Sequence, residues 1–250
     1  MVESGNLPVR NFRDGYFPVE KITGGVIKDT IRIGMEGCYA CPIRCKKVVN
    51  FDEPYPCDPA YGGPEYETLA AFGSNCGIDD IKAICKGNER ANANSLDTIS
   101  TGGTIAFAME CFENGLLTSK DTGGLDLRFG NAEAMVALIE QIARREGFGD
   151  VLAEGSLRAS RQIGRDTEKY AMQVKGQEMA LHDPRTKFAH GVGMVTSPPY
   201  RMQVDLGDDN TVHRFEVIAR CTTGEQARDS VTTEPVPISG RFDVELQQLY

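Results

Sequence analysis

The spacing of apolar positions predicts helices over most of the middle of the chain. An apolar stripe from Met135 to Ile142 has the period of one helical face, follows a capping residue at Asn131 and should stop at Gly147. The same reasoning predicts helices from a cap at Asp79-Asp80 to about Asn92, from near Asp97 to Gly115, and from about Gly149 to Gly164. The pattern favours a mainly α, multihelical fold.

Other stretches lack this period. Residues 1–36 are mixed and glycine-rich, with an extended lead-in predicted at residues 7–12, and the prolines and glycines of residues 51–64 predict a loop. Residues 182–211 show little periodicity, and a stretch of that length inside a compact domain is usually functional. This change of texture predicts two domains, at 1–170 and 171–250. The last residues, 243–250, form an apolar helical pattern without a cap, so we expect the second domain to be incomplete.

Composition excludes several functional classes. The chain has 250 residues and a formal net charge of −9, and an acidic surface argues against a nucleic-acid partner. No window approaches the roughly 18 to 20 apolar residues of a membrane span, and the first residues lack the pattern of a signal peptide. Eight cysteines are too few for a disulfide scaffold of this length. We therefore expect a cytoplasmic protein without a membrane span.

Three of the cysteines, Cys38, Cys41 and Cys45, form a C-x2-C-x3-C cluster. Thiolates at this spacing can converge on one soft metal centre, and Pro42 together with nearby basic residues suits a loop around an anionic group. A zinc site would normally show a second pair of ligands, and the three histidines lie far away in the sequence. An iron–sulfur cluster with three local cysteines and one remote cysteine fits the spacing best. Burial of all three in the core is the alternative.

The other five cysteines have weaker claims as ligands. Cys85 and Cys111 lie in apolar helical patterns and are predicted to belong to the core. Cys57, Cys76 and Cys221 lie in predicted loops, and any of them can be the fourth ligand, although none stands in a motif that indicates it.

Eight runs, in order along the chain, resemble the tungsten-containing aldehyde ferredoxin oxidoreductase family. The runs are Gly37-Cys-x2-Cys-Pro-Ile-x-Cys45, Gly63-Pro-Glu-Tyr-Glu-Thr68, Phe72-Gly-Ser-Asn-Cys-Gly77, Leu96-Asp-Thr-Ile-Ser100, Glu110-Cys-Phe-Glu-Asn-Gly115, Leu125-Asp-Leu-Arg-Phe-Gly-Asn131, Leu152-Ala-Glu-Gly155 and Val174-Lys-Gly-x-Glu178. They cover nearly all of the chain up to about residue 200. Agreement of eight separate runs is more specific than one cysteine triplet.

The resemblance implies two all-α domains that follow an N-terminal domain absent from this sequence, the second of the two being incomplete. It implies a [4Fe–4S] cluster held by Cys38, Cys41 and Cys45, with the fourth cysteine in a D-x-x-G-L-C-type motif beyond residue 250. It also implies a tungsten or molybdenum bis-pyranopterin cofactor, ferredoxin or a partner electron-transfer subunit as electron acceptor, a small-molecule substrate, and a second copy of the chain as a further candidate partner.

The family's pterin-binding pattern, D-x-x-G-L-D, corresponds to residues 92–97. Leu96 and Asp97 match the pattern, whereas Asn92 replaces its first acid and Ser95 its glycine. A carboxylate or amide here can accept hydrogen bonds from a pterin ring, and Asp97 can also cap a helix. The pair Gly102-Gly103 that follows suits either close approach of a cofactor or tight helix packing.

Four residues are candidates for catalysis. The resemblance places a glutamate near the metal in the region of Glu65 and Glu67, where a carboxylate can act as a general base. Family members carry a histidine in the strip that corresponds to residues 195–203, but here Arg201 stands about where it would be. Arg201 can instead neutralise a carboxylate or thioester substrate, and His182 is the alternative acid–base group.

The reaction implied by the resemblance is oxidation of an aldehyde to a carboxylic acid, with electrons passed through the cluster to ferredoxin. The altered histidine strip keeps a benzoyl-CoA-reductase-like member, or another member that does not act on aldehydes, as an alternative. A non-catalytic iron–sulfur electron-transfer module is the alternative from another functional class.

Overall fold

The computed structural model describes residues 5–186, 191–194, 205–206, 211–214 and 236–237. The residues group into two compact units, one formed by Leu7–Leu181 and another that contains Asn6 and the described residues from His182 onward. The predicted domains at 1–170 and 171–250 stay a prediction.

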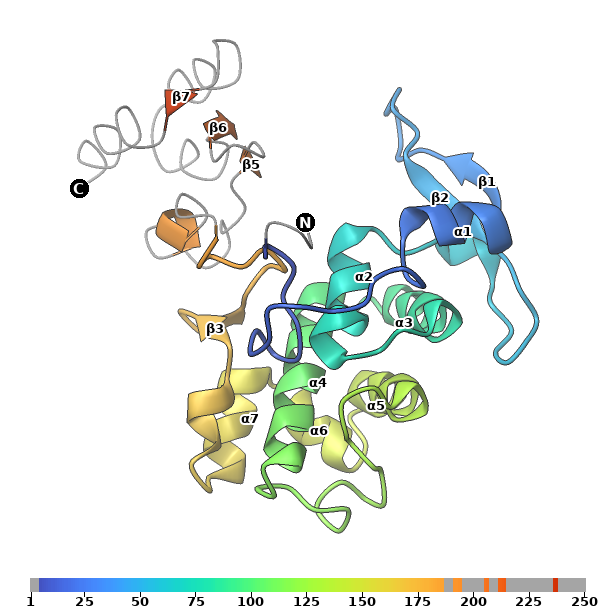
Figure 1. Cartoon of the computed structure of the whole chain (residues 1–250). Coiled ribbons are helices and arrows are strands. Elements are labelled where there is room, and N and C mark those ends of the chain that lie inside the picture. Colours follow the sequence, from blue (N-terminus) through green and yellow to red (C-terminus); the bar gives the residue numbers. More distant parts are fainter. Residues whose placement is uncertain (1–4, 187–190, 195–204, 207–210, 215–235, 238–250) are drawn as a thin grey trace. The chain divides into compact units, whose positions relative to one another are not determined.

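The Leu7–Leu181 unit is mainly helical (Figure 1). Its α-helices are α1 (Gly24–Thr30), α2 (Tyr66–Phe72), α3 (Ile81–Ala93), α4 (Thr98–Glu113), α5 (Ala132–Arg144), α6 (Phe148–Leu152) and α7 (Ser156–Ile163). Short 3-10 helices are η1 (Pro59–Tyr61), η2 (Ser74–Cys76) and η3 (Thr167–Tyr170). The mainly α fold class that the sequence predicts is confirmed.

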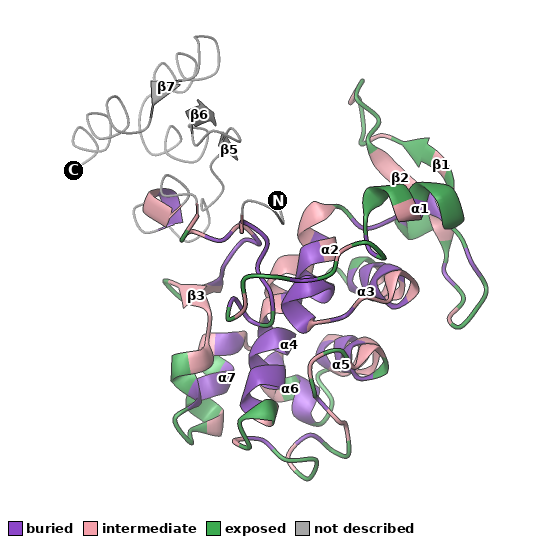
Figure 2. Ribbon diagram, viewed as in Figure 1, coloured by how far each residue is buried: buried purple, intermediate pink, exposed green. Residues whose placement is uncertain are grey.

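Helix α4 forms the centre of this unit, with contacts to α2, α3, α5 and α7 (Figure 1). It is buried on most sides (Figure 2), and every residue from Thr104 to Cys111 is buried. A helix that is apolar all round belongs in a core rather than on a surface. The neighbouring helix α5 instead buries one face, which includes Met135, Leu138 and Ile139.

Three predicted helix starts are confirmed, each with the expected cap. Asp80 accepts hydrogen bonds from the backbone N–H groups at the start of α3, Asp97 does so for α4, and Asn131 for α5. These caps satisfy N–H groups that have no partner within the helix, which is why short polar side chains mark helix starts in sequence.

One predicted helix end is wrong, and one predicted helix is divided in two. Helix α5 ends at Arg144, before Gly147, because Arg145 adopts a left-handed conformation with a φ of 54°. The guanidinium of Arg145 pairs with Asp150 and Glu154, which holds this turn in place. The single helix predicted from Gly149 to Gly164 is two helices, α6 and α7, separated at Gly155, where φ is 82°.

A β-hairpin that the sequence pattern did not predict carries the cysteine loop. Strands β1 (Arg32–Glu36) and β2 (Lys46–Val49) pair antiparallel, with Met35 opposite Lys47 and Glu36 opposite Lys46. The base of the hairpin is anchored in an apolar cluster formed by Ile27, Ile31, Val49, Phe51, Cys57 and Cys85. The far end of the hairpin extends away from this cluster, and β1 and α1 are largely exposed (Figure 2).

The extended lead-in predicted at residues 7–12 is also wrong in part. Arg10, Asn11 and Phe12 have φ values of 44°, 57° and 62°, so they form a left-handed turn. Such a turn is costly for residues other than glycine and persists only where tertiary contacts hold it. Here the N–H groups of Arg10 and Asn11 donate to the carbonyls of Ser74 and Asn75.

The side chain of Asn11 strengthens this attachment. Its Nδ2 donates to Glu110 Oε2 at 2.6 Å and to the carbonyl of Tyr170 at 2.8 Å. Burial raises the pKa of Glu110, while the hydrogen bond from Asn11 and the nearby Arg13 act in the opposite direction. The first residues of the unit are thus fixed to α4 by side chains far away in sequence.

The remaining strands are short. β3 (Gln173–Val174) and β4 (Gln177–Glu178) form a hairpin whose two-residue turn, Lys175-Gly176, has positive φ at both positions. In the other unit, β5 (Asp205–Leu206), β6 (Thr211–Arg214) and β7 (Val236–Pro237) form an antiparallel sheet in the order β5-β6-β7. No helix among the described residues has the length and apolar character needed to cross a bilayer.

Candidate functional site

The three candidate cluster ligands lie on the loop between β1 and β2. Cys38 and Cys45 are exposed, Cys41 is half-buried, and none of the three is in a disulfide. The loop is tight, because the N–H of Cys41 donates to the carbonyl of Cys38 and a Cβ on Gly37 would lie 3.2 Å from the backbone of both Cys41 and Arg44. The alternative that these cysteines belong to the core is therefore wrong.

The three thiols share a loop, but the described residues contain no group of three His, Cys, Asp or Glu side chains gathered to hold a metal ion. The chemistry of the donor set still fits an iron–sulfur cluster, which is held by cysteine thiolates. All three donors come from eight consecutive residues, and basic side chains stand beside them at Arg44, Lys46 and Lys47.

The other cysteines in the described part of the chain differ from those of this loop in their burial. Cys57, Cys76, Cys85 and Cys111 are all buried. Burial, followed by the charge of Glu89, raises the pKa of Cys57 to about 12, and burial likewise raises the pKa of Cys76, whose Sγ lies against the carbonyls of Ala71 and Gly102. The core prediction for Cys85 and Cys111 is confirmed, and Cys57 and Cys76 join them. Cys221 lies outside the described residues.

The candidate pterin contacts lie on the turn between α3 and α4. Asn92 is exposed and donates from Nδ2 to the carbonyl and to Oδ1 of Asn88, at 2.9 and 3.1 Å. Asp97 is exposed, and its Oδ2 caps α4 by accepting from Ser100 N at 2.8 Å. Leu96 is half-buried, with its N–H bonded to the carbonyl of Ala91. The turn therefore presents side-chain oxygens to solvent, as a ligand with N–H donors requires.

Ser95, at the glycine position of the family pattern, has a φ of 57° and ends α3 in a left-handed conformation. A non-glycine residue in this conformation costs roughly 1 kcal/mol or more. We expect Ser95→Gly to raise the free energy of unfolding by about 1 kcal/mol, measured by denaturant titration. Ser100→Gly, in the first turn of α4, is the matched control and should lower it by a similar amount. Equal effects of the two changes would contradict this explanation.

The two glycines of α4 have separate roles. A Cβ on Gly102 would lie 2.6 Å from Ala71 Cβ and 2.8 Å from the Ala71 carbonyl carbon, so this glycine allows α2 and α4 to cross closely. A Cβ on Gly103 would lie 3.1 Å from the side chain of Glu178, a tighter contact than usual but with a side chain that can shift. Close approach of a cofactor and tight helix packing were the two explanations for this glycine pair, and the contacts of Gly102 support tight helix packing.

The structure separates the two candidate glutamates. Glu65 is exposed, and its Oε2 lies 2.9 Å from Lys47 Nζ on β2. Glu67 is half-buried in the first turn of α2, where its Oε2 accepts from Leu181 N at 2.8 Å. The neighbouring Tyr66 donates to the Leu181 carbonyl at 2.6 Å, and burial raises its pKa, so it stays a neutral donor. Tyr66 and Glu67 thus bind the carbonyl and the N–H of Leu181, respectively.

His182 belongs to the other unit, where Asn6 Nδ2 lies 3.2 Å from its Nδ1. An amide nitrogen can only donate, so this contact favours the neutral tautomer with the proton on Nε2. The next residue, Asp183, is buried and pairs with the guanidinium of Arg185. Arg201 lies outside the described residues.

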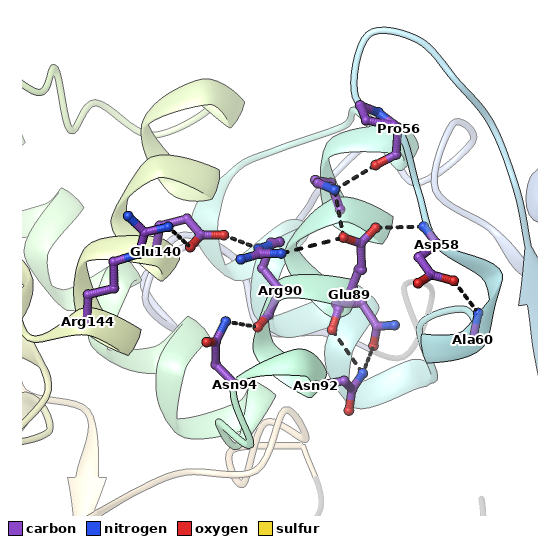
Figure 3. A network of polar contacts seen from close by, with 11 residues as sticks. Pro56, Asp58, Ala60, Glu89, Arg90, Asn92, Asn94, Glu140 and Arg144 are labelled. Atoms are coloured by element: carbon purple, nitrogen blue, oxygen red, sulfur yellow. Dashed lines mark hydrogen bonds and ion pairs between the residues drawn. The ribbon is translucent and has the colours of Figure 1, made fainter.

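Sequence reasoning missed a polar network that surrounds Glu89 (Figure 3). The side chain of Glu89 is 5% exposed, and it accepts from Lys86 Nζ at 2.6 Å and from Asp58 N at 2.9 Å. Arg90 extends the network to Glu140 on α5. The spacing of Lys86 and Glu89 was visible in the sequence, but only burial distinguishes this pair from a solvated surface pair.

A family model for "Aldehyde ferredoxin oxidoreductase, domains 2 & 3" matches residues 1–210. The match covers most of the 250 residues, so the chain belongs to the aldehyde ferredoxin oxidoreductase family. The resemblance inferred from the eight sequence runs is confirmed.

Several similar relatives come from Pyrococcus species. The chain is 41% identical over 199 residues to the "Tungsten-containing aldehyde ferredoxin oxidoreductase" of Pyrococcus abyssi, a match that covers 78% of this chain and 32% of the relative. It is 33% identical over 226 residues to the "Aliphatic sulfonate oxidoreductase, WOR-like subunit" of Pyrococcus furiosus, covering 87% of this chain and 35% of the relative. The chain spans about a third of the length of these curated relatives.

A solved structure is also similar. The "Active site complex BamBC of Benzoyl Coenzyme A reductase in complex with 1,5 Dienoyl-CoA" aligns with a TM-score of 0.58 and 26% identity, covering 72% of this chain and 27% of that one. The proteins that resemble this chain thus carry names that refer to different substrates.

Proposed function

We propose that this chain is part of an oxidoreductase that oxidises an aldehyde to a carboxylic acid at a tungsten or molybdenum bis-pyranopterin. Electrons would pass through a [4Fe–4S] cluster to ferredoxin or to a partner electron-transfer subunit. The observation that supports this proposal most directly is the cysteine loop, with three accessible thiols on one hairpin in a chain that belongs to this family.

Cys38, Cys41 and Cys45 would hold the cluster, and a fourth cysteine would come from another part of a longer protein. Asn92, Leu96 and Asp97 would contact the pterin. Asn92 donates from its nitrogen to Asn88 and can offer its Oδ1 to a pterin N–H. Asp97 uses Oδ2 to cap α4 and can offer its Oδ1 in the same way. When bound, the pterin-held metal would supply the two-electron chemistry, and the cluster would pass the electrons on one at a time.

Of the two glutamates, Glu67 is the better candidate for a general base. It is less exposed than Glu65, and its hydrogen bond from Leu181 N fixes the orientation of the carboxylate. Glu65 is instead engaged with Lys47 at the base of the cysteine hairpin. The role proposed for Glu67 is to accept a proton from water or substrate at its carboxylate, which needs a carboxylate in a fixed position.

His182 is the second acid–base candidate, with Nδ1 facing Asn6 and Nε2 as the position that carries the exchangeable proton. Arg201 would bind an anionic or thioester group of the substrate.

A second candidate function is reduction or oxidation of a substrate that is not an aldehyde. It is favoured by Arg201, which stands near the position where the family resemblance implies a histidine, and by the similarity to the benzoyl-CoA reductase complex. An iron–sulfur electron-transfer module without a pterin would need the cysteines but not Asn92, Asp97 or Glu67.

Metal analysis of the complete, anaerobically purified protein tests these alternatives. We expect about one tungsten or molybdenum and about four irons per chain. Iron without tungsten or molybdenum would favour the electron-transfer module, and zinc without iron would contradict both. If the metals are present, two activity assays with a viologen dye separate the enzymatic functions. One assay uses aldehydes as substrates and the other uses carboxylic acid thioesters.

A further inference from the structure

A buried carboxylate at the end of the β3–β4 hairpin has no part in the function proposed above. Glu178 is 6% exposed, and its Oε1 accepts hydrogen bonds from three uncharged donors. They are Ser156 N at 2.7 Å, Ser156 Oγ at 2.8 Å and Thr104 Oγ1 at 3.3 Å. A Cβ on Gly103 would lie 3.1 Å from this side chain, so the carboxylate is closely packed as well as hydrogen-bonded.

The start of α7 explains how a buried charge is tolerated here. Ser156 is the first residue of α7, and such a position has a backbone N–H without a partner in the helix. The preceding residue, Gly155, has no side chain to cap it, and a Cβ there would lie 3.2 Å from Glu178 Oε1. Glu178 therefore supplies the cap, and the donors together with the positive end of the helix offset the cost of burying the carboxylate.

The segment that begins at Glu178 leads directly to Glu67. All of residues 178–181 are buried. At the far end of this segment, the N–H of Leu181 donates to Glu67 Oε2 at 2.8 Å and its carbonyl accepts from Tyr66 at 2.6 Å. Three residues of chain span at most about 10 Å, so a shift at one end is passed to the other with little slack. Side chains thus fix both ends of the segment.

Helix α4 completes a ring of contacts around this segment. Gly102 lies against Ala71 of α2, and the next two residues of α4 contact Glu178. The segment in turn reaches α2 through Leu181. Each of the three parts therefore contacts the other two, and a close-packed frame of this kind transmits displacements rather than absorbing them.

We propose that Glu178 is a positioning residue for the general base Glu67. It holds the segment in place, so the Leu181 N–H stays where it orients the Glu67 carboxylate. This proposal rests on the proposed function, in which Glu67 accepts a proton, while Glu178 does not touch the reacting atoms. A misplacement of about 1 Å in a catalytic group can lower the rate about 100-fold, and this loss appears in kcat rather than in KM.

Glu178→Ala in the complete, metal-loaded protein tests the proposal. With a viologen dye as acceptor, we expect kcat to fall at least about 10-fold while the KM of the organic substrate stays within about 3-fold. Glu178→Gln keeps an oxygen for the same donors and should retain kcat within about 3-fold. Glu110→Ala is the matched control, because Glu110 is also 6% exposed and accepts from a neutral donor, Asn11. It should lower the melting temperature by a similar amount and keep kcat within about 2-fold.

Two further measurements separate positioning from a general loss of stability. In a Glu67→Gln background, Glu178→Ala should lower the remaining kcat by no more than about 2-fold, because no base is left to position. Hydrogen exchange provides a readout that does not depend on turnover. The N–H of Leu181 should exchange at least about 10-fold faster in Glu178→Ala and at the wild-type rate in Glu110→Ala, measured by mass spectrometry.

Three results would overturn the proposal. The first is wild-type exchange at Leu181 in Glu178→Ala, and the second is the same fold loss of kcat with and without Glu67. The third is an equal loss of kcat in Glu178→Ala and Glu110→Ala. Wild-type kcat in Glu67→Gln would refute the proposed role of Glu67 and this proposal with it, whereas unchanged exchange at Leu181 overturns this proposal alone.

A milder variant replaces Glu178→Ala if that protein does not fold. Ser156→Ala combined with Thr104→Val removes both hydroxyl donors and leaves the backbone N–H on the carboxylate. Exchange at Leu181 should then be about 3-fold faster or more, with a parallel loss of kcat. Wild-type exchange and kcat in this double variant would overturn the proposal.

Discussion

Replacing Cys41 with serine is expected to abolish the paramagnetic signal of the reduced cluster in the complete protein. Cys41 is the middle one of the three proposed ligands, and its N–H closes the turn onto the carbonyl of Cys38, so a neighbouring side chain cannot take its place without rebuilding the loop. Serine is a poor ligand for the soft iron–sulfur core. Iron content should fall from about four per chain to well below one, measured by electron paramagnetic resonance together with metal analysis.

Cys111→Ala is the matched control for this loss. Cys111 is fully buried in α4, and burial followed by the charge of Glu110 raises its pKa to about 12, so it stays a protonated thiol. This variant should keep the iron and the signal of the wild-type protein. A normal signal in Cys41→Ser would remove Cys41 from the ligand set, and loss of iron in both variants would show that the loop is not the specific determinant.

Glu89→Ala should strongly destabilise the helical unit. The carboxylate is 5% exposed and accepts from Lys86 Nζ and from the backbone of Asp58 (Figure 3). Its removal leaves the backbone N–H of Asp58 without its acceptor and the largely buried ammonium of Lys86 without its charged partner, although the carbonyl of Pro56 still accepts from that ammonium. Such a loss typically costs about 3 kcal/mol. For a unit of this size the melting temperature should fall by roughly 6 to 12 °C, measured by calorimetry.

Two further variants define the cause of this loss. Glu89→Gln keeps an acceptor but removes the charge, so its effect should lie between those of wild type and Glu89→Ala. Glu168→Ala removes an exposed glutamate that pairs with the exposed Arg161, and its melting temperature should stay close to that of wild type. Similar losses in Glu89→Ala and Glu168→Ala would contradict the role of burial.

Some parts of the fold and of the candidate site were predictable because their signals are local. The caps at Asp80, Asp97 and Asn131 act on N–H groups two or three residues away, so the sequence pattern contains the whole interaction. The cysteine spacing and the family runs are local in the same sense, and they identified the family before any contact was known. The end of α5 was not predictable, since Arg145 takes a left-handed conformation that the sequence would assign to Gly147.

Other features depend on contacts between distant parts of the chain. The left-handed turn at residues 10–12 exists because η2 and Glu110 hold it, and Gly102 is needed because α2 lies against it at Ala71. The different surroundings of Glu65 and Glu67, two residues apart, arise from Lys47 on β2 and from Leu181.

The sequence by itself thus determined the family, the helical class and the three thiols of the loop, because these are properties of short segments. Only the tertiary structure decided which glutamate is fixed by a backbone N–H and which cysteines are buried. Burial and pairing are set by residues that fold back from far along the chain, and no local pattern carries that information.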